Sequence, residues 1–221
     1  MTLSYDLYWS FRSPYSYFVI KRLVALERDY DVRCNVRVVY PIAVRQPDFF
    51  ANSDPLWVQY FMRDTGRCAA FLDLPFAWPS PDPVVMDMAT RTYPKEQPHI
   101  YRLSQLGHAA ASMGKGLAFL DEVSSVIWGG TVRNWHQGDH LADAATRAGL
   151  NLAELDAMIA ADPECYHRGV EANQQAQRQG GHYGVPLMVF DGEPFFGQDR
   201  FDQMKWRMDQ KGLAKVQSPI G

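Results

Sequence analysis

Cysteine is scarce in this chain: its 221 residues include three, Cys34, Cys68 and Cys165. Their number is odd and they lie far apart in the sequence. The sequence therefore predicts neither a disulfide framework nor a cysteine-rich zinc site. We expect all three to be free, buried thiols.

The chain also lacks a charge excess and long apolar runs. It has 22 Lys and Arg against 25 Asp and Glu, a net charge of -3, which gives no basic surface for nucleic acid or an anionic membrane. No stretch offers the roughly 18 consecutive apolar residues of a membrane span, and the first residues do not resemble a secretory leader. We therefore expect a cytoplasmic protein with neither nucleic acid nor a membrane as partner. A hydrophobic content of 47% is ample for a sizeable core.

Hydrophobic periodicity predicts a strand, a helix and a strand at the start of the chain, and two strands and a helix at its end. The first three elements are predicted at 3–9, 14–28 and 32–40, with a parallel crossover between the strands. The last three are predicted at 187–190, at 193–196 after the two-residue turn Asp191-Gly192, and from about Asp199 onward.

The segment between these two ends is helical in pattern. Helices are predicted at 56–72, 101–113, 117–127, 139–148, 152–161 and 164–179. Asp139 and Asn151 are candidate N-caps of two of them. The sequence thus predicts an α/β domain formed by residues 1–45 and 181–221, split by a helical insertion at 46–180.

The most informative motif is Ser13-Pro14-Tyr15-Ser16, where the first strand gives way to a helix. A strand followed by C-P-x-C at a helix start is typical of a dithiol oxidoreductase, but serines replace both cysteines here, so no disulfide can form. The ordinary interpretation makes Ser13 a helix N-cap. A functional interpretation is that its hydroxyl donates to a thiolate at the positive end of the helix.

Three short strings share their order and context with a known family: FRSPYSY at 11–17, YGVP at 183–186 and FFGQDR at 195–200. With the split domain, they resemble the 2-hydroxychromene-2-carboxylate isomerase and kappa-class glutathione transferase family. The resemblance covers almost the whole chain. It implies a thioredoxin-like, DsbA-like α/β fold interrupted by a large all-helical insertion, and it implies a homodimer.

The resemblance also implies a glutathione site. Family members use the serine that matches Ser13 to hold and activate the glutathione sulfur. Val185 and Pro186 match the backbone that holds the cysteinyl part, while Gln198 and Asp199 match the pair that binds the γ-glutamyl end. Asn52 lies near a family asparagine that contacts glutathione or substrate.

Each of these positions has a structural interpretation as well. Val185-Pro186 can be an ordinary trans turn, although the thioredoxin-like context favours a cis bond that frees the Val185 backbone to pair with an extended peptide. Asp199 at the start of the last helix is by default an N-cap.

Candidate substrate contacts are Arg45, Tyr15 and Trp9. Arg45 has the chemistry for a bidentate contact with a substrate carboxylate, and the two aromatic rings are candidates for lining a pocket. The alternatives are a solvated surface arginine and aromatic side chains buried in the core.

His136 and His140 have the i, i+4 spacing that metal sites use on a helix. Gly138 interrupts that helix and no third ligand is evident. We expect no metal.

The resulting hypothesis is a glutathione-dependent cis-trans isomerase of the 2-hydroxychromene-2-carboxylate isomerase type, acting on an aromatic-degradation intermediate. A kappa-like glutathione transferase is the first alternative, because the same thiolate activation serves both reactions. A non-catalytic thiol- or peptide-binding module is the second.

Overall fold

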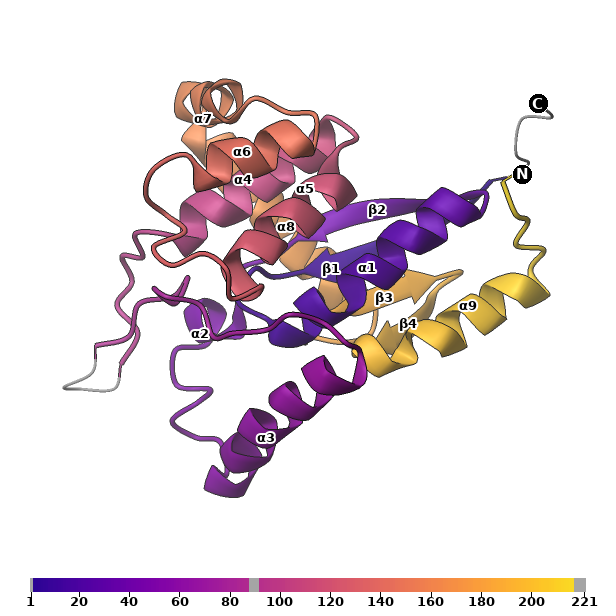
Figure 1. Cartoon of the computed structure of the whole chain (residues 1–221), viewed down its shortest axis with the longest axis horizontal. Coiled ribbons are helices and arrows are strands. Elements are labelled where there is room, and N and C mark those ends of the chain that lie inside the picture. The colour runs from indigo at the N-terminus through magenta and orange to yellow at the C-terminus, as the bar shows by residue number, and fades with distance from the viewer. Residues whose placement is uncertain (1, 88–91, 217–221) are drawn as a thin grey trace.

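The computed structural model describes residues 2–87 and 92–216 (Figure 1). In chain order its elements are β1 (Leu3–Trp9), α1 (Pro14–Asp29), β2 (Val32–Val38), α2 (Ile42–Arg45), α3 (Pro55–Phe71), α4 (Ile100–Ser112), α5 (Gly116–Trp128), α6 (His140–Arg147), α7 (Leu152–Ala161), α8 (Pro163–Gln179), β3 (Leu187–Phe190), β4 (Glu193–Phe196), the 3-10 turn η1 (Gln198–Arg200) and α9 (Phe201–Gln210).

The strands form one sheet in the order β2-β1-β3-β4. β1 and β2 are parallel, with α1 as their crossover, whereas β3 is antiparallel to both β1 and β4. The hairpin turns at Asp191 and Gly192, both with positive φ, as a two-residue turn between twisted strands requires. This confirms the predicted α/β class and the parallel crossover.

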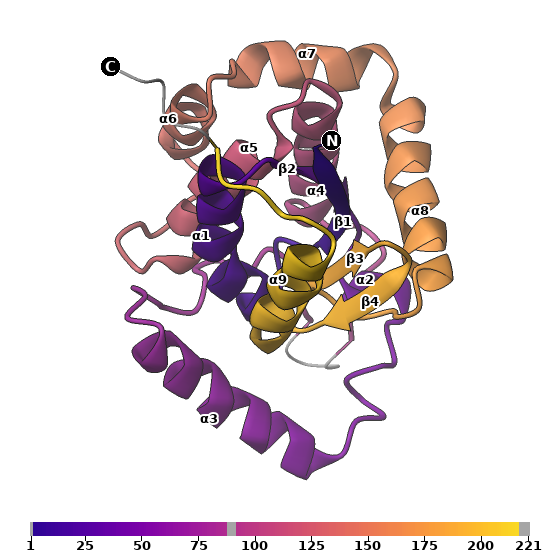
Figure 2. The same cartoon turned by 90° about the vertical axis from the view of Figure 1, so that its right-hand side faces the viewer.

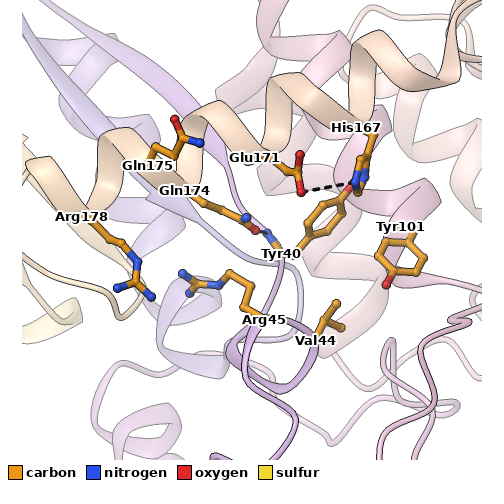
Figure 3. A pocket seen from close by; sticks show the side chains of 9 residues that line it. All are labelled: Tyr40, Val44, Arg45, Tyr101, His167, Glu171, Gln174, Gln175 and Arg178. Atoms are coloured by element: carbon orange, nitrogen blue, oxygen red, sulfur yellow. Dashed lines mark hydrogen bonds and ion pairs between the residues drawn. The ribbon is translucent and has the colours of Figure 1, made fainter.

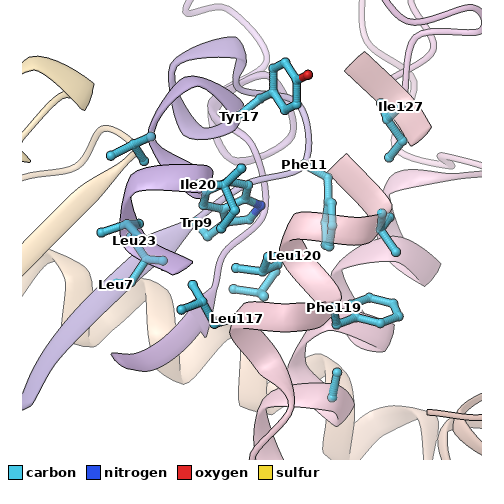
Figure 4. Close-up of a cluster of buried hydrophobic side chains, with 14 of the residues drawn as sticks. Leu7, Trp9, Phe11, Tyr17, Ile20, Leu23, Leu117, Phe119, Leu120 and Ile127 are labelled. Atoms are coloured by element: carbon cyan, nitrogen blue, oxygen red, sulfur yellow. The ribbon is translucent and has the colours of Figure 1, made fainter. Parts of the chain in front are cut away.

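Alternate residues of β1 face opposite sides of the sheet. Leu7 and Trp9 enter the main core beneath α1 and α5 (Figure 4), while Tyr8 between them packs with Leu187 against Ala176 of α8. Because side chains alternate along a strand, the sheet is covered on both faces. Met204 and Met208 of α9 complete the core on the α1 side.

The middle of the chain adds α3 to α8, which confirms the expected helical insertion. α4 and α5 pack on β2, and α5 also packs on α1, so the insertion and the α/β part share one hydrophobic core. α3 extends away from this core along one side of the molecule (Figure 2). The domain boundaries at 45/46 and 180/181 stay a prediction, and residues 217–221 of the second segment lie outside the described residues.

Some local details differ from the sequence-based predictions. The short helix α2 was not predicted, and β2 ends at Val38 rather than residue 40. Asp139 makes no side-chain capping bond, because its backbone (φ -97°, ψ 5°) is not extended as an N-cap requires. Asn151 is extended and accepts from the amides of Ala153 and Glu154. The cysteines are free, as predicted, but their expected burial is wrong, because Cys34 and Cys68 are only partly buried and Cys165 is exposed.

Within residues 2–87 and 92–216, no helix combines the length and the apolar character that crossing a membrane requires.

Candidate functional site

Ser13 lies between the carboxyl end of β1 and the first turn of α1. Its hydroxyl oxygen accepts from the Ser16 amide at 3.2 Å, so the predicted N-cap is confirmed. The same hydroxyl donates to the backbone carbonyl of Val185 at 3.3 Å. Ser13 therefore connects the start of α1 to the loop before β3.

The Val185-Pro186 peptide bond is cis, which confirms the expectation from the sequence. In the described part of the chain, the Val185 amide N–H has no hydrogen-bond partner. The loop is held instead by its neighbours: Gln177 Nε2 donates to the Gly184 carbonyl at 2.7 Å, and the Gly197 amide donates to the Pro186 carbonyl at 3.0 Å. A fixed backbone with a free donor is available beside the Ser13 hydroxyl.

Gly184 allows an aromatic ring to cover this loop. A Cβ at Gly184 would lie 2.5 Å from an atom of the Phe196 ring, well inside van der Waals contact. His182 stacks on the Phe196 ring, with ring centroids 3.8 Å apart. The absence of a side chain at Gly184 thus sets the position of the Phe196 ring next to Val185.

Ser13 lines a pocket of ≈ 390 Å³ whose walls are largely aromatic. The lining residues include Arg12, Ser13, Tyr15, Arg45, Phe49, Phe50, Trp57, Phe61, Tyr183, Val185 and Phe196. An adjoining hollow of ≈ 910 Å³ shares Arg12, Pro14, Phe50, Trp57 and Phe61 with it and continues to Trp78 and Trp128. The two volumes together form a cleft between α1 and α3 that suits a flat apolar molecule.

Arg12 lies in the wall of both volumes. Its guanidinium makes a bidentate ion pair with Asp82, with N···O distances of 2.9 and 3.0 Å. It also lies over the rings of Phe50 and Tyr93, at 5.5 and 5.6 Å from their centroids. One side chain therefore ties the loop around Asp82 to the aromatic wall.

Tyr15, a predicted substrate contact, lines the pocket and reaches α3. Its hydroxyl donates to Asp64 Oδ2 at 2.7 Å. Burial, followed by this hydrogen bond, raises the pKa of Tyr15. Although burial acts in the opposite direction, the hydrogen bonds from Arg67 and Tyr15 keep the pKa of Asp64 below its ordinary value. Tyr15 thus fixes α3 over the pocket.

Polar contacts continue from Asp64 to the predicted γ-glutamyl site. The Cys68 thiol lies 3.5 Å from Asp64 Oδ2 and 3.9 Å from Gln198 Nε2. Gln198 and Asp199 form part of η1 and do not line the Ser13 pocket.

Asp199 is exposed and pairs with Arg200 at 3.2 Å. The expected N-cap role of Asp199 is wrong, because Arg200 occupies the N-cap position of α9.

Arg22 is a site residue that the sequence did not reveal. Its Nη2 donates to the Gln198 carbonyl at 2.9 Å and also contacts the Gln198 side chain. Its Nε is buried and has no partner among the described residues. Arg22 lies seven residues after Tyr15, on the same side of α1, a spacing that could have drawn attention to it. Nothing in the sequence indicated its partner 176 positions away.

The remaining predicted residues have different locations. Trp9 is 0% exposed and lies in the core beneath α1 (Figure 4), so its expected place in the pocket is wrong. Asn52 is exposed in a separate hollow with Gln46 and Phe49. Arg45 lines the Ser13 pocket, but its guanidinium donates to Gln177 Oε1 at 3.2 Å and to the Tyr183 carbonyl at 3.0 Å.

The His136 ring lies against His99, with centroids 4.7 Å apart. Across the described ranges, no group of three or more His, Cys, Asp or Glu side chains has the arrangement of a metal site.

Solved structures resemble this chain over nearly its full length. A structure of 2-hydroxychromene-2-carboxylate isomerase has a TM-score of 0.71 and 18% identity, covering 95% of this chain and 96% of that one. The cytosolic disulfide reductase DsbM from Pseudomonas aeruginosa has a TM-score of 0.59 and 16% identity, with 95% and 98% covered. The same reductase with GSH has a TM-score of 0.58 and 15% identity, with 95% and 98% covered. No curated protein sequence matches the chain.

At these identities the structural neighbours share the fold with the chain and leave its reaction open. A family model provides the assignment, because the DSBA-like thioredoxin domain matches residues 5–209. That range includes the serine-containing motif, the cis-proline loop, the sheet and the helical insertion. The chain therefore belongs to the DSBA-like thioredoxin domain family.

Proposed function

We propose that this protein is a glutathione-dependent cis-trans isomerase of the 2-hydroxychromene-2-carboxylate isomerase type, acting on an aromatic-degradation intermediate. The observation that supports it best is the environment of Ser13. A hydroxyl, rather than a thiol, stands at the N-terminus of α1, beside the Val185 backbone and at the opening of an aromatic cleft. Such a site is suited to a sulfur that arrives with a ligand.

The residues present fit glutathione at its sulfur end. The Val185 amide N–H, which lacks a partner among the described residues, is available to an extended cysteinyl backbone. Gln198, held by Arg22, and the adjacent Asp199 would bind the γ-glutamyl end, where the Asp199 carboxylate suits a free ammonium group. Asn52, exposed beside the pocket-lining residue Phe49, remains a proposed contact for the rest of the ligand.

Ser13 would act on the ionisation of the bound thiol. A hydrogen bond to a charged group contributes about 1.5 to 3 kcal/mol, and each pKa unit corresponds to about 1.36 kcal/mol. Donation from Ser13, together with the positive end of α1, can therefore lower a thiol pKa from about 8.5 toward 7. To do this, the Ser13 hydroxyl turns its hydrogen from the Val185 carbonyl to the sulfur.

Bound glutathione would supply a sulfur nucleophile: addition to a conjugated carbon would turn a carbon–carbon double bond into a single bond, and rotation about that bond followed by elimination of the thiolate would give the isomer. The chain's own residues position the substrate and exclude water. Trp57 and Phe61 form an aromatic wall for the ring, while Tyr15 keeps α3 in place through Asp64. Arg45 is the proposed contact for a substrate carboxylate at the other side of the pocket.

The direct test measures isomerisation of 2-hydroxychromene-2-carboxylate with and without glutathione, in the wild-type protein and in Ser13→Ala. Turnover should require glutathione and should fall sharply in the variant. Activity that is indifferent to both changes would overturn the proposal. Tight glutathione binding without turnover on this substrate or other electrophiles would instead indicate a binding module. Formation of a stable glutathione conjugate would indicate a transferase.

We also propose a homodimer. α3 leaves large apolar side chains on its outer face, with Leu56 71% and Phe71 86% exposed. Tyr60 lies between them on the same side of the helix and is exposed as well. Several large apolar side chains exposed on one side of a helix are typical of a protein interface.

A further inference from the structure

A further hollow of ≈ 460 Å³ lies between α2, α4 and α8 (Figure 3). Its lining residues are Tyr40, Val44, Arg45, Tyr101, His167, Glu171, Gln174, Gln175 and Arg178. Arg45 is the one residue that also lines the Ser13 pocket. Arg45 is also the proposed contact for the substrate carboxylate, but none of the residues proposed to hold glutathione lines this hollow, so its remaining polar lining needs a separate explanation.

One face of α8 supplies most of the polar lining. His167, Glu171, Gln174 and Arg178 follow one another at intervals of four, three and four residues, which places them along a single side of the helix. Inward of this row, Asn173 Nδ2 donates to the Val38 carbonyl at 2.9 Å, and Gln177 holds the Gly184 carbonyl. The buried side-chain amides of Asn173 and Gln177 thus attach α8 to the sheet and to the loop before β3. These contacts hold the polar row over the hollow.

Two guanidinium groups meet at one end of the hollow. Arg45 and Arg178 extend toward one another (Figure 3). The hydrogen bonds from Arg45 go only to neutral oxygens, those of Gln177 and Tyr183. Its Nε is buried and lacks a partner within the described part of the chain. Burial and then repulsion from Arg178 lower the pKa of Arg45 to about 10. A partly buried cation without a counter-charge is costly, and an anion between the two groups would remove that cost.

The negative charge in the hollow is held at the other end. Glu171 pairs with His167 Nε2 at 3.5 Å, and His167 Nδ1 is bonded to the Tyr40 hydroxyl at 2.8 Å. Beyond this row the walls are apolar and aromatic. The Tyr101 ring packs edge-on against Tyr40, with centroids 5.2 Å apart, and Val44 lines the same end. The hollow is therefore cationic at one end and aromatic at the other.

We propose that this hollow is a second ligand site, which binds a small carboxylic acid with an apolar or aromatic body. The carboxylate lies between Arg45 and Arg178, where each guanidinium can offer two N–H donors. The body of the ligand packs against Val44 and Tyr101. Bare inorganic phosphate would satisfy the cations but would leave the aromatic end unused, so the site favours an organic carboxylate.

The site has a physical connection to the Ser13 pocket. Arg45 Nη2 donates to the Tyr183 carbonyl, and Arg45 Nη1 donates to Gln177, whose own amide holds the Gly184 carbonyl. These two carbonyls immediately precede Val185. A ligand that fixes Arg45 therefore also steadies the loop on which Val185 lies.

The test uses isothermal titration of the full-length protein with benzoate, benzamide and inorganic phosphate. We expect one benzoate per chain, no benzamide binding and weaker phosphate binding. Arg178→Gln should weaken benzoate binding about tenfold, which corresponds to about 1.4 kcal/mol. Arg178 is exposed, so this substitution leaves the core intact. Arg168→Gln is the matched control, since Arg168 is an exposed cation of α8 that pairs with Glu164 outside the hollow.

Several outcomes would overturn this second site. These are an absence of benzoate binding, equal binding of benzamide, tighter binding of phosphate than of benzoate, or an affinity unchanged by Arg178→Gln. Loss of benzoate binding in Ser13→Ala would show that benzoate occupies the Ser13 pocket instead. Because the expected result requires neither glutathione nor turnover, it is independent of the proposed isomerase activity.

Discussion

The Ser13 hydroxyl donates to the Val185 carbonyl at 3.3 Å, across 172 positions of sequence. This contact joins the first helix to the cis-proline loop at the point where a dithiol oxidoreductase would have its attacking thiol. The hydroxyl has one hydrogen, so a thiolate at this site must compete with the Val185 carbonyl for it.

Ser13→Ala should raise the pKa of bound glutathione thiol by about one to two units, since a hydrogen bond to a charged group contributes about 1.5 to 3 kcal/mol. Because a thiol with a pKa near 7 is half ionised at pH 7, the reaction at that pH should slow by about 5- to 50-fold, and it should recover as the pH rises. The thiolate absorbance of the complex, followed against pH, measures the shift directly.

Ser16→Ala is the matched control. The Ser16 hydroxyl is buried and has no hydrogen-bond partner among the described residues. The bond that Ser16 does make to Ser13 comes from its backbone amide and survives the substitution. The thiolate pKa should therefore stay at its wild-type value. An equal shift in both variants would remove the special role of Ser13.

Tyr15→Phe should lower the free energy of unfolding by about 1 kcal/mol near neutral pH; partial solvent access of the Asp64 carboxylate keeps the value modest. Because the pKa of Asp64 is depressed in the folded protein, the stability it provides is present above its unfolded pKa and is lost as the pH falls through its folded pKa. The loss of unfolding free energy caused by Tyr15→Phe should therefore become smaller as the pH falls over that range. Urea unfolding at a series of pH values measures it.

The control for this pH dependence is Tyr17→Phe. The Tyr17 hydroxyl donates to the Pro75 carbonyl at 2.7 Å, an acceptor that does not titrate. Loss of this hydrogen bond should lower the free energy of unfolding by a similar amount at every acidic pH. If the loss of unfolding free energy becomes smaller by the same amount in both variants as the pH falls, the role given to Asp64 is contradicted.

Arg12→Lys should raise KM for the aromatic substrate several-fold and change kcat less. A lysine cannot reproduce the bidentate pair with Asp82 or the flat contact with Phe50 and Tyr93. Arg102→Lys is the comparison, because Arg102 makes a bidentate pair with Asp156 away from the cleft. If the two variants have the same KM, Arg12 does not shape the pocket.

Gly184→Ala should disrupt the Val185 loop, because the added methyl group would overlap the Phe196 ring. We expect a loss of glutathione binding with a small effect on overall folding, measured by titration and by circular dichroism. Phe196→Leu combined with Gly184→Ala should restore part of the binding by removing the ring. Wild-type binding in the single variant would mean that the loop tolerates a side chain there.

Leu56→Asp combined with Phe71→Asp should convert the proposed dimer to a monomer, because both changes place charge on the exposed apolar face of α3. Sedimentation equilibrium measures the mass. Met113→Asp, at another exposed apolar position, serves as the control. A dimer that survives the double substitution would exclude this face of α3 as the interface.

The sequence was a good guide to elements whose signals are local. Pro14 and Ser13 marked the start of α1, and the Asp191-Gly192 turn marked the hairpin, because these residues fix backbone torsions by themselves. The sequence was a poorer guide where a residue type that is common at N-caps can also adopt other backbone conformations. Asp139 and Asn151 both looked like N-caps, but only Asn151 has the extended backbone that capping requires.

For the candidate site, the sequence indicated Ser13, Tyr15 and Val185, which lie around one pocket. Trp9 was assigned wrongly because alternation along a strand reveals two faces without saying which one meets a cavity. Arg22 was missed because its contact with Gln198 depends on how η1 packs against α1.

By itself, the sequence determined that serines replace the motif's cysteines, and it determined the strand and helix order around them, since composition and periodicity are properties of the chain alone. The tertiary structure decided which distant groups meet: Ser13 with Val185, Tyr15 with Asp64, and Arg45 with Arg178. Such pairings follow from the packing of helices and sheet, and no local spacing encodes them. The absence of the cysteine thiol can therefore be seen in the sequence, whereas the site that would bind the thiol of a ligand is formed only by the fold.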